Sequence, residues 1–129
     1  MESFEDFGVL LPTRGVLVYA GGGKPKVELN WQMAETAERM GYDSVWVSDH
    51  IILPRQVESF YPYAADGVAT FRPDEPYYEP LAALNFLAGC TQKVRLGTHV
   101  LILPYRNPVL TAKLLSTLDV LSGGRVILG

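Results

Sequence analysis

An acid and an imidazole stand side by side directly after a short apolar stretch of the sequence. Residues 44–47 read Ser-Val-Trp-Val, and Asp49-His50 follows them. Such runs are typical of strands buried on both faces in parallel sheets. In those folds chemistry takes place at the carboxyl ends of strands, because the loops that leave there converge on one face. Asp49 and His50 are therefore candidate catalytic residues. The alternative is that Asp49 caps a turn and His50 forms a local hydrogen bond.

A second candidate region interrupts another apolar stretch, at residues 94–104. Gly97-Thr98-His99 lies inside it, and a glycine within a strand often marks a bulge or the close approach of a ligand. Because neighbouring parallel strands end at the same edge, Thr98 and His99 are expected to face the same pocket as Asp49 and His50. The alternative for His99 is a hydrogen-bonded structural histidine.

The elements that position these residues alternate regularly. Strands are predicted at 7–12, 44–47, 94–104 and 125–128, and helices at 25–40, 80–90 and 108–121. Pro80 and Asn107-Pro108 mark helix starts, and Gly41 and Gly123 mark helix ends. In the first helix the stripe predicted to be buried consists of Leu29, Met33, Ala37 and Met40, widened by Trp31 and Ala34. In the third helix it consists of Leu110, Leu114, Leu118 and Leu121.

The order βαβαβαβ predicts an α/β fold with parallel strands joined by right-handed crossovers. Two architectures fit it: an open doubly wound sheet, or the N-terminal half of a (β/α)₈ barrel in one domain over residues 1–129. A glycine-rich segment, Gly21 to Lys24, suggests a flavodoxin-like phosphate or nucleotide binder as an alternative function. The P-loop spacing is absent there, so a flexible loop at the rim of a site is the preferred interpretation.

Composition narrows the class of protein. The chain is 48% apolar with a formal charge of −3 and no basic stripe, so nucleic acid is not an expected partner. A single cysteine, Cys90, excludes an intrachain disulfide, and no metal-binding pattern is present. No apolar run is long enough to span a bilayer, and the acidic start MESFED does not resemble a signal peptide. We therefore expect a cytoplasmic protein with no membrane partner.

The longest segment without predicted helix or strand covers residues 53–77 and is rich in proline and aromatic residues. Segments of this length are usually functional or disordered. Its aromatic side chains are expected to pack against something, which argues against disorder. They include Phe60, Tyr61, Tyr63 and Phe71. A lid over a substrate pocket and a packed structural insertion are both compatible with this pattern.

Several stretches spread over nearly the whole chain carry a family resemblance. They are Phe7-Gly-Val-Leu-Leu-Pro12, Ala37-Glu38, Gly41-Tyr-Asp-Ser-Val-Trp-Val, Asp49-His50, Glu79-Pro80, Val94 to Pro104, Arg106-Asn-Pro108 and Leu118 to Arg125. In this order they resemble the bacterial luciferase-like monooxygenase family, whose members are flavin- or F420-dependent (β/α)₈-barrel oxidoreductases. The proline- and tyrosine-rich loop after His50 is similar to that of the F420-dependent branch.

The resemblance implies roles at the matching positions. Asp49 and His50 would lie at the reacting edge of a bound F420, or alternatively FMN, with His50 as proton donor or base. A bulge at Thr98-His99-Val100, often containing a non-proline cis peptide in this family, would support the cofactor ring. The implied reaction is hydride transfer between the cofactor and a small organic substrate.

The resemblance also implies a limit, because a (β/α)₈ barrel takes roughly 250 residues. The 129 residues correspond to the first four strands, so this chain alone is expected not to be a competent enzyme. A truncated, non-catalytic luciferase-like fragment is the alternative function. In the full-length form a homo-oligomer is expected.

Overall fold

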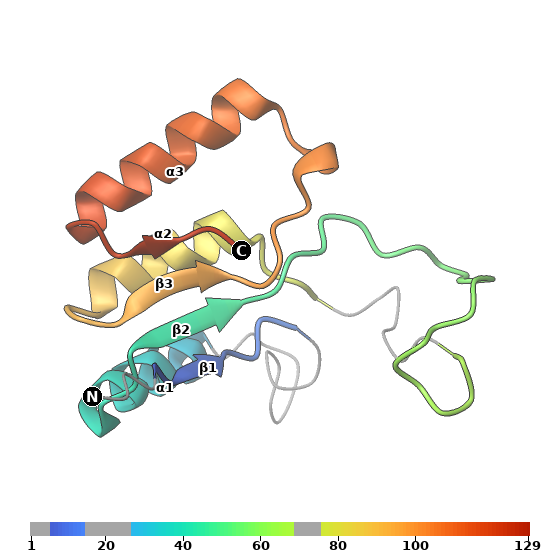
Figure 1. Cartoon of the computed structure of the whole chain (residues 1–129), viewed down its shortest axis with the longest axis horizontal. Helices are drawn as coiled ribbons and strands as arrows, with labels where there is room; N and C mark the ends of the chain where they lie inside the picture. Colours follow the sequence, from blue (N-terminus) through green and yellow to red (C-terminus); the bar gives the residue numbers. More distant parts are fainter. Residues whose placement is uncertain (1–5, 15–26, 69–75) are drawn as a thin grey trace, which may run out of the picture.

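The computed structural model describes residues 6–14, 27–68 and 76–129. Within these ranges the chain forms a four-stranded sheet covered by helices, with a long segment that extends away from it (Figure 1). The glycine-rich segment from Gly21 to Lys24 and the aromatic residue Phe71 lie outside the described residues.

The strands follow one another across the sheet in chain order. They are β1 (Gly8–Leu10), β2 (Ser44–Val47), β3 (Arg95–Thr98) and β4 (Val126–Ile127), paired in the order β1-β2-β3-β4. All three pairings are parallel. A doubly wound sheet reverses its strand order at a switch point, whereas a (β/α)₈ barrel keeps chain order. The doubly wound alternative therefore does not fit, and the barrel architecture is confirmed.

Three helices connect the strands: α1 (Val27–Met40), α2 (Pro80–Cys90) and α3 (Pro108–Ser122). The Glu79 carboxylate accepts a hydrogen bond from the Ala82 N–H at the start of α2, and the Asn107 side chain caps α3 in the same way. Such caps satisfy backbone donors that the first helical turn leaves unpaired. At the other end of α3, Gly123 adopts a left-handed conformation with φ 72°. The predicted helix signals at these ends are therefore confirmed.

The hydrophobic core lies between the sheet and the helices. Its fully buried strand residues come from β2 and from the start of β3, and its helix residues come from all three helices. The members are Leu11, Ala34, Ala37, Val45, Val47, Leu84, Leu87, Val94, Leu96 and Leu118. Register explains the set, because Val45 pairs with Leu96 and both must then project to the same side of the sheet.

The buried face of α3 differs from the predicted leucine stripe. Leu118 is buried, but the other three stripe residues, Leu110, Leu114 and Leu121, are exposed. The face turned inward carries Thr111, Leu118 and Ser122. Polar residues fit there because their hydroxyls bond to carbonyls of their own helix, so hydrophobicity alone marked the wrong side.

The first helix also departs from prediction. Ala34 and Ala37 are buried as expected, whereas Met40 is 69% exposed, and Asn30 joins the two alanines on the buried face. These positions are four and three residues apart, which is the spacing of one helical face. A polar residue therefore occupies a core-facing position that the apolar pattern did not reveal.

Trp46 explains why glycine occurs inside two strands. A Cβ atom at Gly97 or Gly8 would collide with the Trp46 indole, which lies across both neighbouring strands. The Trp46 Nε1–H donates to the Ser44 hydroxyl at 2.8 Å, which fixes the ring. Among the described residues, the group that approaches Gly97 closely is the Trp46 ring, which the sequence pattern did not indicate.

Gly97→Ala should lower the free energy of unfolding by about 1–3 kcal/mol, the usual cost of overpacking. In a Trp46→Leu background the same change should cost less, because the colliding ring is gone. Urea denaturation of the four chains measures both values. Gly89→Ala is the matched control: a Cβ there meets nothing within 4 Å, so this helical substitution should stabilise. Equal losses at Gly97 in both backgrounds would contradict the assignment.

Glu38 ties the end of α1 to the start of β3. Its carboxylate accepts backbone hydrogen bonds from Gln92 at 2.9 Å, from Lys93, and from Val94 at 3.0 Å. Burial alone would raise the pKa of Glu38, but these donors and the charge of Arg125 outweigh burial. The pKa of Glu38 therefore lies below its ordinary value of 4.5.

Glu38→Gln should destabilise the chain by about 1–2 kcal/mol, because a neutral amide accepts these hydrogen bonds more weakly. A carboxylate with a lowered folded-state pKa stabilises above its unfolded pKa, and this contribution disappears as the pH falls. The difference between wild type and Glu38→Gln should therefore be full above pH 4.5 and shrink below it. Chemical denaturation at several pH values tests this. Glu35→Gln, at an exposed position of the same helix, is the matched control and should leave the free energy of unfolding nearly unchanged at pH 7.

The segment after β2 contradicts one expectation. Phe60 and Tyr63 are 75% and 87% exposed, so they do not pack against the body of the protein. Tyr61 and Tyr63 contact each other edge to face, with ring centroids 5.5 Å apart. Figure 1 shows this part of the chain extending away from the sheet.

Among the described residues, no helix combines the length and apolar character required to cross a membrane.

Candidate functional site at the carboxyl edge of the sheet

The candidate residues predicted from the sequence lie at one edge of the sheet. β2 ends at Val47 and β3 at Thr98, which are paired in register. The His99 N–H donates to the Val47 carbonyl at 2.7 Å, so the two strand ends remain joined where the candidates begin. Asp49 and His50 therefore leave β2 at the same edge at which His99 and Val100 leave β3.

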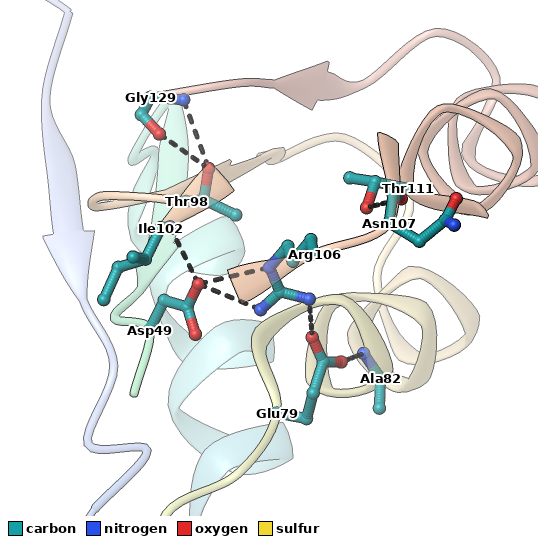
Figure 2. A network of polar contacts seen from close by, with 9 residues as sticks. All are labelled: Asp49, Glu79, Ala82, Thr98, Ile102, Arg106, Asn107, Thr111 and Gly129. Atoms are coloured by element: carbon teal, nitrogen blue, oxygen red, sulfur yellow. Dashed lines mark hydrogen bonds and ion pairs between the residues drawn. The ribbon is translucent and has the colours of Figure 1, made fainter. Parts of the chain in front are cut away.

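Asp49 is the most buried acid of this edge, with a fully buried side chain. Its Oδ2 accepts hydrogen bonds from the Ile102 N–H at 2.9 Å and from Arg106 Nη2 at 2.9 Å. A longer bond of 3.3 Å comes from Arg106 Nε. Figure 2 shows the Asp49 carboxylate facing the Arg106 guanidinium. In this structure Asp49 thus holds the segment after β3 against the segment after β2.

Arg106 extends the network to a helix start. Its Nη1 donates to Glu79 Oε1 at 2.6 Å, while Glu79 Oε2 accepts the Ala82 N–H at 2.7 Å (Figure 2). Burial alone would lower the pKa of Arg106, but hydrogen bonds and charges from Asp49 and Glu79 raise it, so the guanidinium stays charged. Sequence reasoning assigned neither Arg106 nor Glu79 to the site. The only signal was their place in Glu79-Pro80 and Arg106-Asn-Pro108, which mark helix starts.

His50 follows Asp49 and is half-buried. Its ring contacts Tyr77 edge to face, with centroids 5.0 Å apart. Burial lowers the pKa of His50 and is the largest influence, the charge of Asp49 raises it, and Arg14 lowers it. The result is a pKa below the ordinary value of 6.5. At neutral pH the imidazole is therefore predominantly uncharged and able to accept a proton.

The segment Thr98-His99-Val100 has two different parts. Thr98 is buried, and its hydroxyl exchanges hydrogen bonds with the backbone of Gly129 at 3.1 and 3.2 Å, as Figure 2 shows. Its side chain therefore connects β3 to the residues after β4. His99 and Val100 are exposed, and the peptide bond between them is cis, as the family resemblance implied.

Three hydroxyl groups that sequence reasoning missed form a chain that starts at Tyr77, whose ring contacts His50. The Ser48 hydroxyl lies 2.6 Å from the Tyr77 hydroxyl and 3.3 Å from that of Thr13. Arg14 and Tyr77 form an antiparallel bridge, and the Tyr78 N–H donates to the Thr13 carbonyl. The segment after β1 and the segment before α2 thus meet at the same edge. No group of three or more metal-binding side chains occurs among the described residues.

Asp49→Asn should lower the free energy of unfolding by about 3 kcal/mol, because it leaves the buried Arg106 charge with Glu79 alone. In an Arg106→Met background the same change should cost much less, since no buried charge loses its partner. Urea denaturation of the double-mutant cycle measures this coupling.

Asp6→Asn is the matched control for that cycle. It breaks the Asp6–Arg95 pair, which has the same 2.9 Å distance but side chains that are 62% and 47% exposed. Exposed pairs contribute under about 1 kcal/mol. Equal losses for Asp49→Asn and Asp6→Asn would contradict a structural role for the buried pair.

Comparison with known proteins adds three similarities. The chain is 37% identical over 99 residues to the F420-dependent glucose-6-phosphate dehydrogenase of Amycolatopsis mediterranei, a match that covers 76% of this chain and 25% of that protein. The fold matches the coenzyme F420-dependent tetrahydromethanopterin reductase of Methanopyrus kandleri with a TM-score of 0.63 and 26% identity. That match covers 96% of this chain and 26% of the other.

The third similarity is in fold alone. The oxygenating constituent of 3,6-diketocamphane monooxygenase from Pseudomonas putida, solved in complex with FMN, matches with a TM-score of 0.62 and 19% identity. The match covers 96% of this chain and 28% of that one.

The chain spans about a third or less of the length of the curated relatives it matches. The family model for luciferase-like monooxygenases matches residues 5–129. With the consecutive parallel strands and the edge just described, this match means that the chain belongs to the luciferase-like monooxygenase family.

Proposed function

We propose that this chain provides the proton-transfer half of an F420-dependent oxidoreductase site, in which His50 exchanges a proton with a small organic substrate. The observation that carries the proposal is the position of His50. It is a half-buried imidazole at the carboxyl edge, directly after the anchored Asp49 and next to Tyr77. The named activity of the Amycolatopsis relative supports F420 as cofactor.

The residues at this edge are compatible with a flat aromatic cofactor. Val100 is 56% exposed beside the His99 backbone and offers apolar surface for a ring. Asp49 Oδ1 is buried and accepts no hydrogen bond from the described residues, so one acceptor remains for a bound donor. Bound F420 would supply a deazaflavin ring that accepts or donates a hydride. His99 and Val100 would hold it, and FMN is the alternative occupant.

Because His50 is uncharged at neutral pH, it acts first as a base when the substrate is oxidised. A base must be unprotonated before it acts, and burial lowers the pKa of His50 below 6.5. When a substrate alcohol is oxidised, an imidazole nitrogen of His50 accepts the hydroxyl proton while the carbon gives up its hydride. Asp49 positions the backbone that carries His50 and stabilises the imidazolium that forms. In the reverse direction the same imidazolium returns the proton.

His50→Ala should lower kcat by ~10²–10⁴, the usual contribution of a positioned base, and change cofactor affinity far less. His99→Ala is the matched variant, an exposed imidazole at the proposed ring support, and should weaken cofactor binding more than turnover. Steady-state kinetics and cofactor titration separate the two effects. The assay uses this chain and, in parallel, the chain joined to the remaining strands of the Amycolatopsis relative, whose length is about four times that of the matched segment.

The pH profile provides a second readout of the same variants. For substrate oxidation, kcat/KM should rise as the pH passes through the lowered pKa of His50 and be level above 6.5. This limb should disappear in His50→Ala. Unchanged turnover in His50→Ala would remove His50 from the mechanism. Binding of FMN in place of F420 would change the cofactor, and binding of neither by the joined protein would favour the non-catalytic alternative.

A further inference from the structure

The Tyr77 ring lies against the His50 imidazole at the carboxyl edge of the sheet. The two ring centroids are 5.0 Å apart, and the ring planes meet at 75°. Aromatic rings prefer this edge-to-face arrangement at centroid distances of about 4.5–7 Å, because their edges are positive and their faces negative. The preference depends on the angle between the rings, so the contact opposes rotation of the imidazole.

Tyr77 is itself held at two points. Its hydroxyl oxygen lies 2.6 Å from that of Ser48, in the segment after β2, and the Ser48 hydroxyl lies 3.3 Å from that of Thr13. Its backbone forms an antiparallel bridge with Arg14, in the segment after β1. A ring that is fixed through both its hydroxyl and its backbone offers a rigid surface to its neighbour.

The anchored carboxylate of Asp49 does not by itself orient the imidazole. Asp49 Oδ2 accepts hydrogen bonds from the Ile102 N–H and from Arg106, which places the backbone of the adjacent His50. The side-chain torsions of His50 still have to be set by contacts of its own ring. Orientation matters, because a base must lie within hydrogen-bond reach of the proton that it removes. A displacement of about 1 Å can lower a rate ~100-fold.

We propose that Tyr77 is the positioning residue of this site: its ring, tethered through Ser48, holds the His50 imidazole in the orientation in which it exchanges a proton with the substrate. This inference rests on the function proposed for His50. The hold on the imidazole, however, is a property of the chain, so it can be measured separately from turnover.

The first test needs no cofactor. The three-bond couplings between the Hα and Hβ protons of His50 report by NMR whether its χ1 torsion occupies one rotamer or several. The chain has two histidines, so His99→Gln assigns the signals. We expect one rotamer in the wild type and averaging over rotamers in Tyr77→Leu. Averaging in the wild type, or a single rotamer in a folded Tyr77→Leu, overturns the proposal.

Tyr105→Leu is the matched control for this measurement. Tyr105 is 58% exposed and lies next to Arg106 in the sequence, between β3 and α3. Its replacement should leave the His50 couplings unchanged. A change as large as that in Tyr77→Leu would mean that loss of any tyrosine near this edge loosens His50, and would overturn the proposal.

Two conservative variants test the tether. Tyr77→Phe and Ser48→Ala each remove the hydrogen bond between the two hydroxyls and retain both rings. Each should give partial averaging of the His50 couplings, and the double variant should give no more than either single one, because both remove the same bond. These variants also carry the test if urea denaturation shows that Tyr77→Leu does not fold. A single rotamer in both overturns the tether and with it the proposal.

Kinetics show whether the orientation serves proton exchange. In the chain joined to the remaining strands of the Amycolatopsis relative, Tyr77→Leu should lower kcat at least about tenfold and change KM less than about twofold, because the ring positions the base. In a His50→Ala background the same substitution should cause no further loss. Equal losses in both backgrounds would mean that Tyr77 acts only through the fold, and would overturn the proposal.

The two readouts distinguish failure of this inference from failure of the proposed function. Unchanged His50 couplings in Tyr77→Leu, together with turnover that depends on His50, would overturn the role of Tyr77 and leave the proposed function standing. Loosened couplings together with turnover that does not depend on His50 would overturn the proposed function and, with it, the use of the hold in proton exchange.

Discussion

The carboxyl edge of this sheet is organised around one buried positive charge, the guanidinium of Arg106. A buried charge is stable only when its partners are close and well aligned. Asp49 and Glu79 meet this requirement from the segment after β2 and from the N-cap of α2. The two ion pairs of Arg106 therefore fix three connections at once: the exit of β2, the start of α2 and the segment between β3 and α3. His50 owes its position to this arrangement, because it is covalently next to Asp49.

The amino edge is held by a second arginine with a different set of partners. Arg125 is buried and uses all five of its N–H donors on the carbonyls of Ala88, Thr91, Val94 and Ser122 and on the Thr91 hydroxyl. It joins the end of α2, the start of β3 and the end of α3. Glu38 adds the end of α1 through three backbone donors in the same region. Each edge is thus closed by a cation that contacts elements far apart in the sequence.

The helices and strands could be predicted because their signals lie in neighbouring residues. Contacts between residues far apart in the sequence could not be predicted in this way. Pro80, Asn107 and Gly123 act on their own helix turns, so the helix ends could be read from neighbouring residues. The leucine stripe of α3 was wrong because the choice between two adjacent faces depends on what packs against them. Arg106 and Asp49 are 57 positions apart, and only the folded chain brings them together. The placement of Asp49 and His50 at a strand end followed from the apolar run, whereas their roles in catalysis stay a prediction.

The two edges differ in what they leave unsatisfied, and this difference separates stability from function. At the amino edge every N–H donor of Arg125 and the Glu38 carboxylate have partners, so these two groups serve the stability of the fold. Toward the carboxyl edge, Asp49 Oδ1 and the Asn30 amide are buried without hydrogen bonds from described residues. Unpaired buried groups cost stability, so their presence on one side only requires a compensating use. In (β/α)₈ barrels the carboxyl side is the side that binds ligands. The unsatisfied groups among the described residues therefore lie toward the side at which barrels of this kind bind their ligands.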